Sequence, residues 1–359
     1  MRASVRRRTL LKALGGGLAT AAFAPSAALA AGQTARRGII DVHAHVAVPT
    51  YLAALAEGGV RPPGYVARGQ TASPTSGGQS ADNPAAMAGR LAMMDRAGVA
   101  MQILFPSLAP YLVDQALAVR AARLANDRHA ALVQAYPGRF LGLAALPLPH
   151  IDAALAELRR GLDDLGLAGV SMHTTCLGTA IADERFAPVF AEMNRRRALL
   201  ILHPSVNGLQ SPLLTDWHLE TSAGPLLEDV TVALQLMAAN IPVRYPDLRI
   251  VVPHLGGGLA TMLDRLDNQM PLAIRGLKAR PSEMARSFWY DTVSHGSAPA
   301  LRAAVEAFGA DRIVPGSDFP VLLSFESYAR TFGYVRDAVS KSAADRILHD
   351  NAATLLRLR

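Results

Sequence analysis

The sequence predicts an α/β protein whose strands close into a (β/α)₈ barrel. Eight short apolar runs recur along the chain, and longer segments with helical apolar spacing separate them. Strict alternation of strand and helix favours parallel pairing, and eight repeats favour closure into a barrel. The predicted strands cover residues 38–46, 100–105, 140–146, 168–173, 199–203, 249–254, 288–293 and 312–316.

Helices are predicted between these strands, and two connections are unusually long. An open doubly wound sheet is the alternative fold, but no Gly-x-Gly-x-x-Gly follows the first strand to bind a dinucleotide. The long connections, residues 64–82 and 205–226, follow the first and fifth strands, at the barrel end where active sites lie. The predicted helices cover residues 85–97, 116–136, 151–165, 186–197, 227–240 and 298–308.

The composition suits one large domain and excludes several classes of protein. The formal charge of +7 includes five basic residues and no acid within residues 1–30, so the remainder carries only +2. That remainder has no basic run, which argues against nucleic-acid binding. Cys176 is the single cysteine, so neither an intrachain disulfide nor a multi-cysteine zinc site can form.

Residues 1–30 have the features of a bacterial twin-arginine export signal. Arg7 and Arg8 precede two leucines and a lysine, and a weakly apolar stretch then ends in the small-residue cleavage pattern Ala28-Leu29-Ala30. Three glycines and a proline interrupt that stretch, which disfavours a stable membrane anchor. We therefore expect a signal peptide over 1–30, a barrel domain over 31–359, and a periplasmic or secreted mature protein. An unused signal would leave the protein in the cytoplasm.

Histidines and one aspartate fall at the ends of four predicted strands. His43 and His45 lie two residues apart on the first strand, so both side chains point to the same face, into the barrel. His203 ends the fifth strand, His254 ends the sixth, and Asp318 follows the eighth. Imidazole and carboxylate ligands suit zinc, manganese or iron, and a catalytic ion keeps one position open. An ordinary strand could carry one His-x-His, but the additional strand-end residues favour a metal site.

Several motifs resemble the amidohydrolase-related family of metal-dependent decarboxylases. They are Ile40-Asp41-Val42-His43-Ala44-His45, Leu202-His203-Pro204, His254-Leu255-Gly256-Gly257 and Gly316-Ser317-Asp318-Phe319-Pro320. The general pattern is similar to the aminocarboxymuconate-semialdehyde and 6-methylsalicylate decarboxylase branches. Leu255 departs from the pattern, because many members have glycine or alanine there. The resemblance extends from residue 38 to the end of the chain.

The resemblance implies both a site and a reaction. His43, His45, His203 and Asp318 would bind one divalent ion, zinc or manganese, and His254 would be a catalytic histidine beside it. The implied reaction is non-oxidative decarboxylation of a small aromatic or unsaturated carboxylic acid, such as a 2-hydroxybenzoate. Either His254 or Asp318 could deliver the proton. Family members commonly associate, so a homodimer is also expected.

Two other functions stay open on the sequence. The same single-metal site could hydrolyse a lactone or an amide with ionised water, because a barrel does not fix the reaction. A secreted binding protein with a structural metal is disfavoured, since structural sites close every coordination position with protein ligands. The fourth strand lacks the lysine with which binuclear relatives bridge two ions, and this supports a single ion.

Further residues could contact a substrate. His173 ends the fourth strand, and His218 beside Trp217 could close over an aromatic ring. Arg61 and Arg68 could bind a carboxylate, although arginine is more commonly solvated. Asp41 is left without a role. Surface or loop positions are expected for His129, His150, His295 and His349.

The export signal gives a direct test. Replacing Arg7 and Arg8 together with lysine should retain the protein in the cytoplasm, because the twin-arginine motif is specific for arginine. Fractionation of a bacterial host expressing both forms measures this outcome. A double variant that still reaches the periplasm would indicate a different export route.

Overall fold

The structure is a computed structural model that describes residues 38–60, 80–205 and 208–358. The expected signal peptide over 1–30 lies outside the described residues, as do Arg61 and Arg68. No helix in the described part of the chain is long and apolar enough to cross a membrane.

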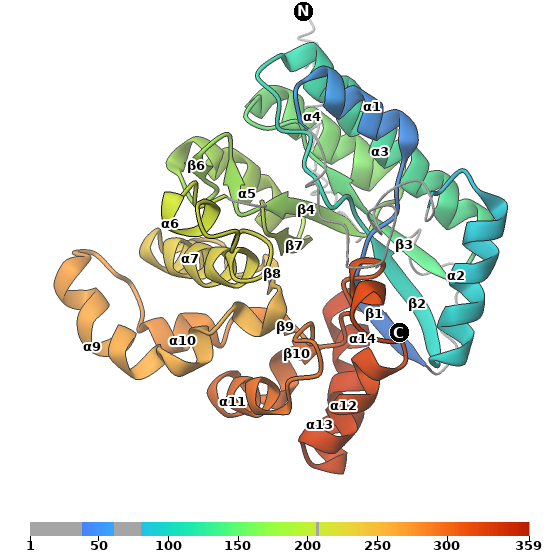
Figure 1. Ribbon diagram of the computed structural model, residues 1–359. Helices are drawn as coiled ribbons and strands as arrows, with labels where there is room; N and C mark the ends of the chain where they lie inside the picture. Colours follow the sequence, from blue (N-terminus) through green and yellow to red (C-terminus); the bar gives the residue numbers. More distant parts are fainter. Residues whose placement is uncertain (1–37, 61–79, 206–207, 359) are drawn as a thin grey trace, which may run out of the picture.

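Eight strands form one parallel sheet in the order β1-β2-β3-β4-β7-β8-β9-β10, with helices around it (Figure 1). The sheet closes between β1 and the chain after β10. There the backbone N–H of Val42 donates to the carbonyl of Pro315 (2.8 Å), and Ala44 forms a parallel bridge with Phe319. The predicted (β/α)₈ barrel and all eight predicted strands are thus confirmed. The strands are β1 Ile39–Ala44, β2 Val99–Leu104, β3 Phe140–Ala145, β4 Gly169–His173, β7 Leu199–His203, β8 Arg249–Val252, β9 Trp289–Asp291 and β10 Ile313–Val314.

The helices begin where the sequence provides a cap or a proline. Asn83 accepts from two backbone N–H groups at the start of α2, and Asp114 and Ser297 cap α3 and α11 by accepting from one backbone N–H each. Proline occupies a first-turn position in α1, α2, α5 and α7, where its missing N–H costs nothing. The main helices are α1 Pro49–Glu57, α2 Pro84–Arg96, α3 Gln115–Ala135, α4 Ile151–Arg159, α5 Ala187–Arg195, α7 Gly224–Ala238, α9 Leu263–Ala273, α11 Ala298–Phe308 and α12 Arg330–Ala338.

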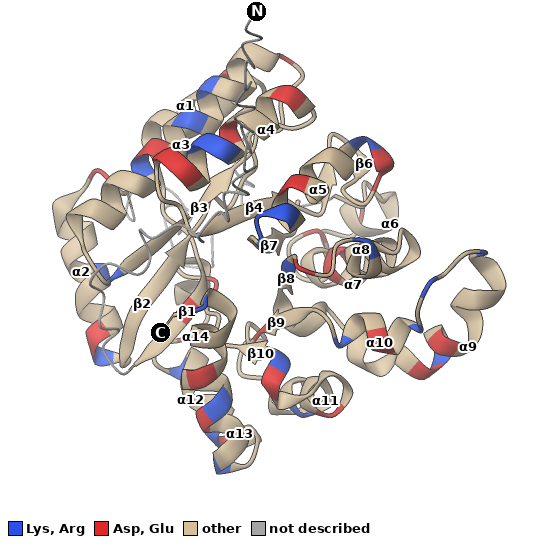
Figure 2. Cartoon of the chain, turned by 180° about the vertical axis from the view of Figure 1, so that it is seen from behind, with Lys and Arg blue, Asp and Glu red and all other residues tan. Residues whose placement is uncertain are grey.

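Shorter elements fill the connections. A two-stranded hairpin, absent from the sequence prediction, follows β4, and short helices interrupt the long connection after β7 and the C-terminal segment. Figure 2 shows that the positions of basic and of acidic residues are both distributed over the surrounding helices. The short elements are β5 Thr175–Cys176, β6 Thr179–Ala180, α6 Pro212–Thr215, α8 Ile241–Arg244, α10 Pro281–Ala285, α13 Lys341–Asp345 and α14 Asn351–Leu356.

The barrel strands are buried on both faces, as expected for a parallel sheet covered by helices. Alternate residues of a strand belong to different apolar clusters. On β3, Phe140 packs with the outer helices, whereas Leu141 and Leu143 join a smaller cluster with residues of the other strands and of α14. This rigid sheet holds the carboxyl ends of the strands in fixed positions, and the site lies there.

Candidate metal and acid–base site

Four of the predicted site residues meet at the carboxyl ends of the barrel strands. His43 lies on β1 and His45 just after it, His203 ends β7, and Asp318 follows β10. Their nearest ligand atoms all lie within 4.8 Å of one another. The three histidines are buried, and Asp318 retains 18 % of its side-chain exposure. Three imidazoles and one carboxylate at this spacing could hold a divalent metal ion.

Each of these histidines is oriented by an oxygen atom behind it. The Nδ1 of His43 contacts Asp291 Oδ2 at 2.7 Å, that of His45 contacts the carbonyl of Phe105 at 3.0 Å, and that of His203 contacts the carbonyl of Pro204 at 2.9 Å. Because the acceptor fixes the proton on Nδ1, the lone pair of Nε2 faces the cluster. His43 Nε2 is buried without a hydrogen-bond partner among the described residues. A metal ion would satisfy this atom.

The protonation states also suit a metal ion. Burial lowers the pKa of His45 and, together with neighbouring histidines, lowers that of His203 well below its ordinary value. Burial raises the pKa of Asp318, but the contact with His45 and the nearby imidazoles lower it below the usual range. Neutral imidazoles at His45 and His203 beside an ionised carboxylate are the forms that bind a cation. Burial lowers the pKa of His43, but Asp291 and Asp318 raise it overall, so a bound cation would displace the proton of His43.

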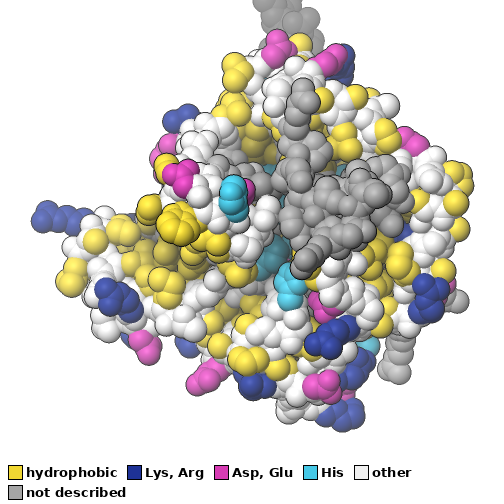
Figure 3. All heavy atoms as spheres, in the orientation of Figure 1, with side chains coloured by type: hydrophobic (Ala, Val, Ile, Leu, Met, Phe, Trp, Pro, Cys, Tyr) yellow, Lys and Arg dark blue, Asp and Glu magenta, His cyan; other side chains and the backbone are white. Residues whose placement is uncertain are grey.

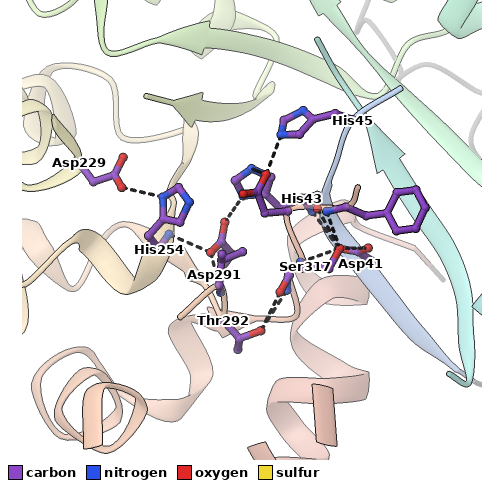
Figure 4. Close-up of polar contacts among 12 residues, drawn as sticks. Asp41, His43, His45, Asp229, His254, Asp291, Thr292 and Ser317 are labelled. Atoms are coloured by element: carbon purple, nitrogen blue, oxygen red, sulfur yellow. Dashed lines mark hydrogen bonds and ion pairs between the residues drawn. The ribbon is translucent and has the colours of Figure 1, made fainter. Parts of the chain in front are cut away.

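Asp41, which the sequence left without a role, links the first strand, β1, to the segment that follows the last strand, β10. Its carboxylate accepts hydrogen bonds from Ser317 Oγ (2.6 Å), Tyr328 Oη (2.8 Å) and Gln102 Nε2 (3.1 Å). It also accepts from the backbone N–H groups of His43 (3.2 Å) and Ser317 (3.0 Å). Asp41 therefore joins the residue before Asp318 to the strand that carries His43, as Figure 4 shows.

His254 lies beside the four-residue cluster and outside it. Its Nδ1 donates to Asp229 Oδ2 (2.7 Å), and its backbone N–H donates to Asp291 Oδ1 (2.9 Å), so that the residue is held between two carboxylates (Figure 4). Its ring centroid is 5.5 Å from that of His43. Burial lowers the pKa of His254, but Asp229 and Asp291 raise it to about 9. His254 lies outside the ligand cluster, and its raised pKa keeps the ring protonated. His254 is therefore suited to donate a proton.

Asp229 was missed by the sequence analysis. It is fully buried on α7, and burial raises its pKa to about 6. Both members of the Asp229–His254 pair thus have raised pKa values, and we assign the proton to His254 because Asp291 also faces it. A possible signal was present: Asp229 shares a helical face with the apolar residues Val232, Ala233 and Leu236.

A pocket of about 680 Å³ opens over the cluster. His45, His203, His254 and Asp318 contribute to its lining, and apolar side chains dominate the remainder. Figure 3 shows histidine side chains near the centre of this face, beside apolar ones. The pocket is large enough to admit a small organic acid.

The other candidate residues fall into different places. His129 and His295 line the pocket, so a surface position was wrong for the fully buried His129. His173 is buried with its ring centroid 5.1 Å from that of His203, and burial lowers its pKa to about 3. Trp217 beside His218 is 73 % exposed, and neither lines the pocket as described. Cys176 is buried, and burial raises its pKa to about 12, which makes a nucleophilic role untenable.

A buried cluster of metal-ligating residues with an adjacent acid–base histidine, at the carboxyl end of a barrel, defines a metal-dependent barrel enzyme. The family model described as Amidohydrolase matches residues 40–358. The chain belongs to the amidohydrolase family.

Individual relatives narrow the class further. A gamma-resorcylate decarboxylase of Rhodococcus jostii is 30% identical over 296 residues, covering 75% of this chain and 87% of the relative. A 2-amino-3-carboxymuconate-6-semialdehyde decarboxylase of Dictyostelium discoideum is 25% identical over 282 residues, covering 75% and 76%. The crystal structure of a 2,6-dihydroxybenzoate decarboxylase with 2,6-dihydroxybenzoate has a TM-score of 0.74 at 26% identity, covering 90% of this chain and all of that one. The protein is a metal-dependent decarboxylase of this family, as the sequence resemblance implied.

The contact between Asp229 and His254 gives a prediction about pH dependence. Asp229→Asn should leave the metal content unchanged and lower kcat by roughly 10²–10³-fold, because the orienting acceptor for His254 is lost. The protonated form of His254 is lost as pH rises through its pKa, and Asp229 raises that pKa. The variant should therefore lose activity at a lower pH than the wild type does.

Metal analysis and a pH–rate profile measure these effects, with Asp264→Asn, an exposed carboxylate on α9, as the matched control. A pH profile identical to that of the wild type would contradict the role assigned to Asp229.

Proposed function

We propose that the protein decarboxylates a 2-hydroxybenzoate-type acid, with His43, His45, His203 and Asp318 as ligands of a single zinc or manganese ion. This proposal rests on one observation: a cluster of four potential metal ligands lies beside a protonated histidine, His254, which Asp229 orients. A divalent ion in this cluster supplies positive charge that polarises the oxygen atoms of a bound acid.

His254 is the proposed proton donor. The carbon that bears the carboxylate accepts the proton from Nε2 of His254, which is the ring nitrogen not engaged by Asp229. The bond to the carboxylate then breaks, its electron pair restores the aromatic ring, and carbon dioxide leaves. His254 regains a proton from solvent, so the net reaction consumes one proton for each carbon dioxide released.

Asp318 is the weaker of the two proton carriers considered from the sequence. Its Oδ1 lies 3.1 Å from Nε2 of His45. Burial raises its pKa, but the contact with His45 and the nearby imidazoles lower it below the usual range. A carboxylate with these contacts resists protonation, whereas the environment of His254 favours the charged imidazolium. The assignment of acid chemistry to His254 rests on this difference.

The proposed substrate class follows from the pocket and from the relatives. Apolar side chains from the segments after β1 and β2 suit a planar aromatic ring. By their names, the relatives decarboxylate hydroxylated or unsaturated acids. Export to the periplasm and association into a homodimer are proposed from the sequence alone.

Turnover in deuterated water tests the reaction. A substituted 2-hydroxybenzoate should yield a phenol with one deuterium at the former carboxyl carbon, together with stoichiometric carbon dioxide, because solvent supplies the new proton. His254→Asn, which should retain the metal, is the control and should be slower by roughly 10²–10⁴-fold.

Hydrolysis is the outcome that would contradict decarboxylation. In that case hydroxybenzoates would stay intact, a lactone or amide would open, and the product would retain labelled oxygen from water. The ligand cluster would still be needed, since both reactions require an open coordination position.

A further inference from the structure

The pocket has two chemically different walls that face each other. In the barrel order, β1 and β2 lie opposite β7 and β8. The segments after β1 and β2 contribute apolar side chains, among them Val46, Val48, Leu52 and Leu108. The connection between β7 and α7 contributes Glu220, Thr221 and Ser222. Pro204, Pro225 and Leu226 also line this second side, so the polar groups that a bound ring would meet there are concentrated at residues 220–222.

Glu220 is the charged member of the polar wall. One of its carboxylate oxygens, Oε2, is buried without a hydrogen-bond partner, and no ion pair involves Glu220 in the part of the chain that the structure describes. A buried carboxylate oxygen without a donor is costly unless a bound molecule supplies one. Because the residue lines the pocket, a ligand can bring that donor.

We propose that Glu220 is the specificity-determining residue of this pocket: it accepts a hydrogen bond from a ring hydroxyl and excludes acids that carry a second carboxylate. This inference rests on the proposed decarboxylation of aromatic acids and narrows it to monocarboxylic substrates with a hydroxyl on the edge facing Glu220. The opposite edge takes hydrogen or an alkyl group, since aliphatic side chains dominate that wall. Tyr51 and Ser107 are among its polar members, and Tyr51 Oη already donates to the carbonyl of Leu108.

Charge repulsion makes the selection strong. Two like charges in a partly desolvated pocket repel each other enough to lower affinity by about tenfold or more. A hydroxyl donating to a carboxylate makes a charge-assisted hydrogen bond, which is stronger than a bond between neutral groups. The same residue thus discriminates in favour of one substituent and against the other.

The test is a binding panel on metal-loaded protein in the His254→Asn background, so that affinity is measured without turnover. The ligands are 2-hydroxybenzoates with a hydroxyl, a methyl or a carboxylate at ring position 4 or 5. With Glu220 present, the tightest ligand should be a hydroxyl compound and the weakest a carboxylate compound. Calorimetric titration gives the six dissociation constants.

Substitutions at position 220 separate charge from hydrogen bonding. Glu220→Gln keeps an acceptor and removes the charge, so it should improve binding of the carboxylate compound about tenfold. It should weaken the hydroxyl compound about threefold, because a charge-assisted hydrogen bond becomes a neutral one. Glu220→Leu should weaken the hydroxyl compound about tenfold. Glu306→Gln, an exposed acid on α11, is the control and should change none of these values.

The results distinguish failure of this inference from failure of the proposed function. Affinities for the carboxylate and hydroxyl compounds that Glu220→Gln leaves unchanged would overturn the role of Glu220, whatever the wild-type enzyme turns over. If the panel binds in the expected order but wild-type enzyme converts none of it, the proposed reaction fails and the role of Glu220 stands. Absence of binding by every compound would overturn both.

Discussion

The junction between β1 and the segment after β10 is the constraint on which the site depends. The backbone N–H of Asp318 donates to the carbonyl of His43 (2.9 Å), and Asp41 binds both the hydroxyl and the backbone N–H of Ser317. Asp318 has a φ of 58°, a conformation that costs a non-glycine residue energy and must be imposed by its surroundings. The contacts that close the barrel are therefore also the contacts that align the Asp318 carboxylate with His43 and His45. Gln102 extends the junction, because it contacts Asp41 and receives a hydrogen bond from the buried Arg90.

Helix α7 provides a second support, on the other side of the site. Glu228 accepts hydrogen bonds from the backbone N–H groups of Ser205 (2.6 Å) and Gly208 (2.8 Å), just beyond the strand that ends at His203. The next residue, Asp229, holds His254. Gly257 allows the helix to approach, since a β-carbon at that residue would overlap the carbonyl oxygen of Leu226. Two consecutive carboxylates of one helix thus position a proposed ligand and the proposed acid.

The functional residues at the ends of strands could be predicted from the sequence, but the contacts that helix residues make with them could not. Apolar runs located all eight strands, and residues at their carboxyl ends must converge in a closed parallel barrel, so His43, His45, His203 and Asp318 could be grouped. Asp229 lies on a helix, and its distance from His254 is set by packing of α7 against the Gly257 turn, which no local pattern encodes. The burial of His129 could not be predicted for the same reason. This residue of helix α3 is fully buried because α3 packs against β3. Asp41 was visible in its motif, yet its role depends on Ser317, which lies 276 residues away in sequence.

The central claim is that this junction creates one metal site from four strand-end residues. Anomalous diffraction from crystals of metal-loaded protein, collected at the absorption edge of zinc or manganese, tests it most directly. We expect one strong peak per chain, about 2.0–2.2 Å from Nε2 of His43, His45 and His203 and from a carboxylate oxygen of Asp318. A principal peak at another location, or two peaks of similar height within the cluster, would contradict it.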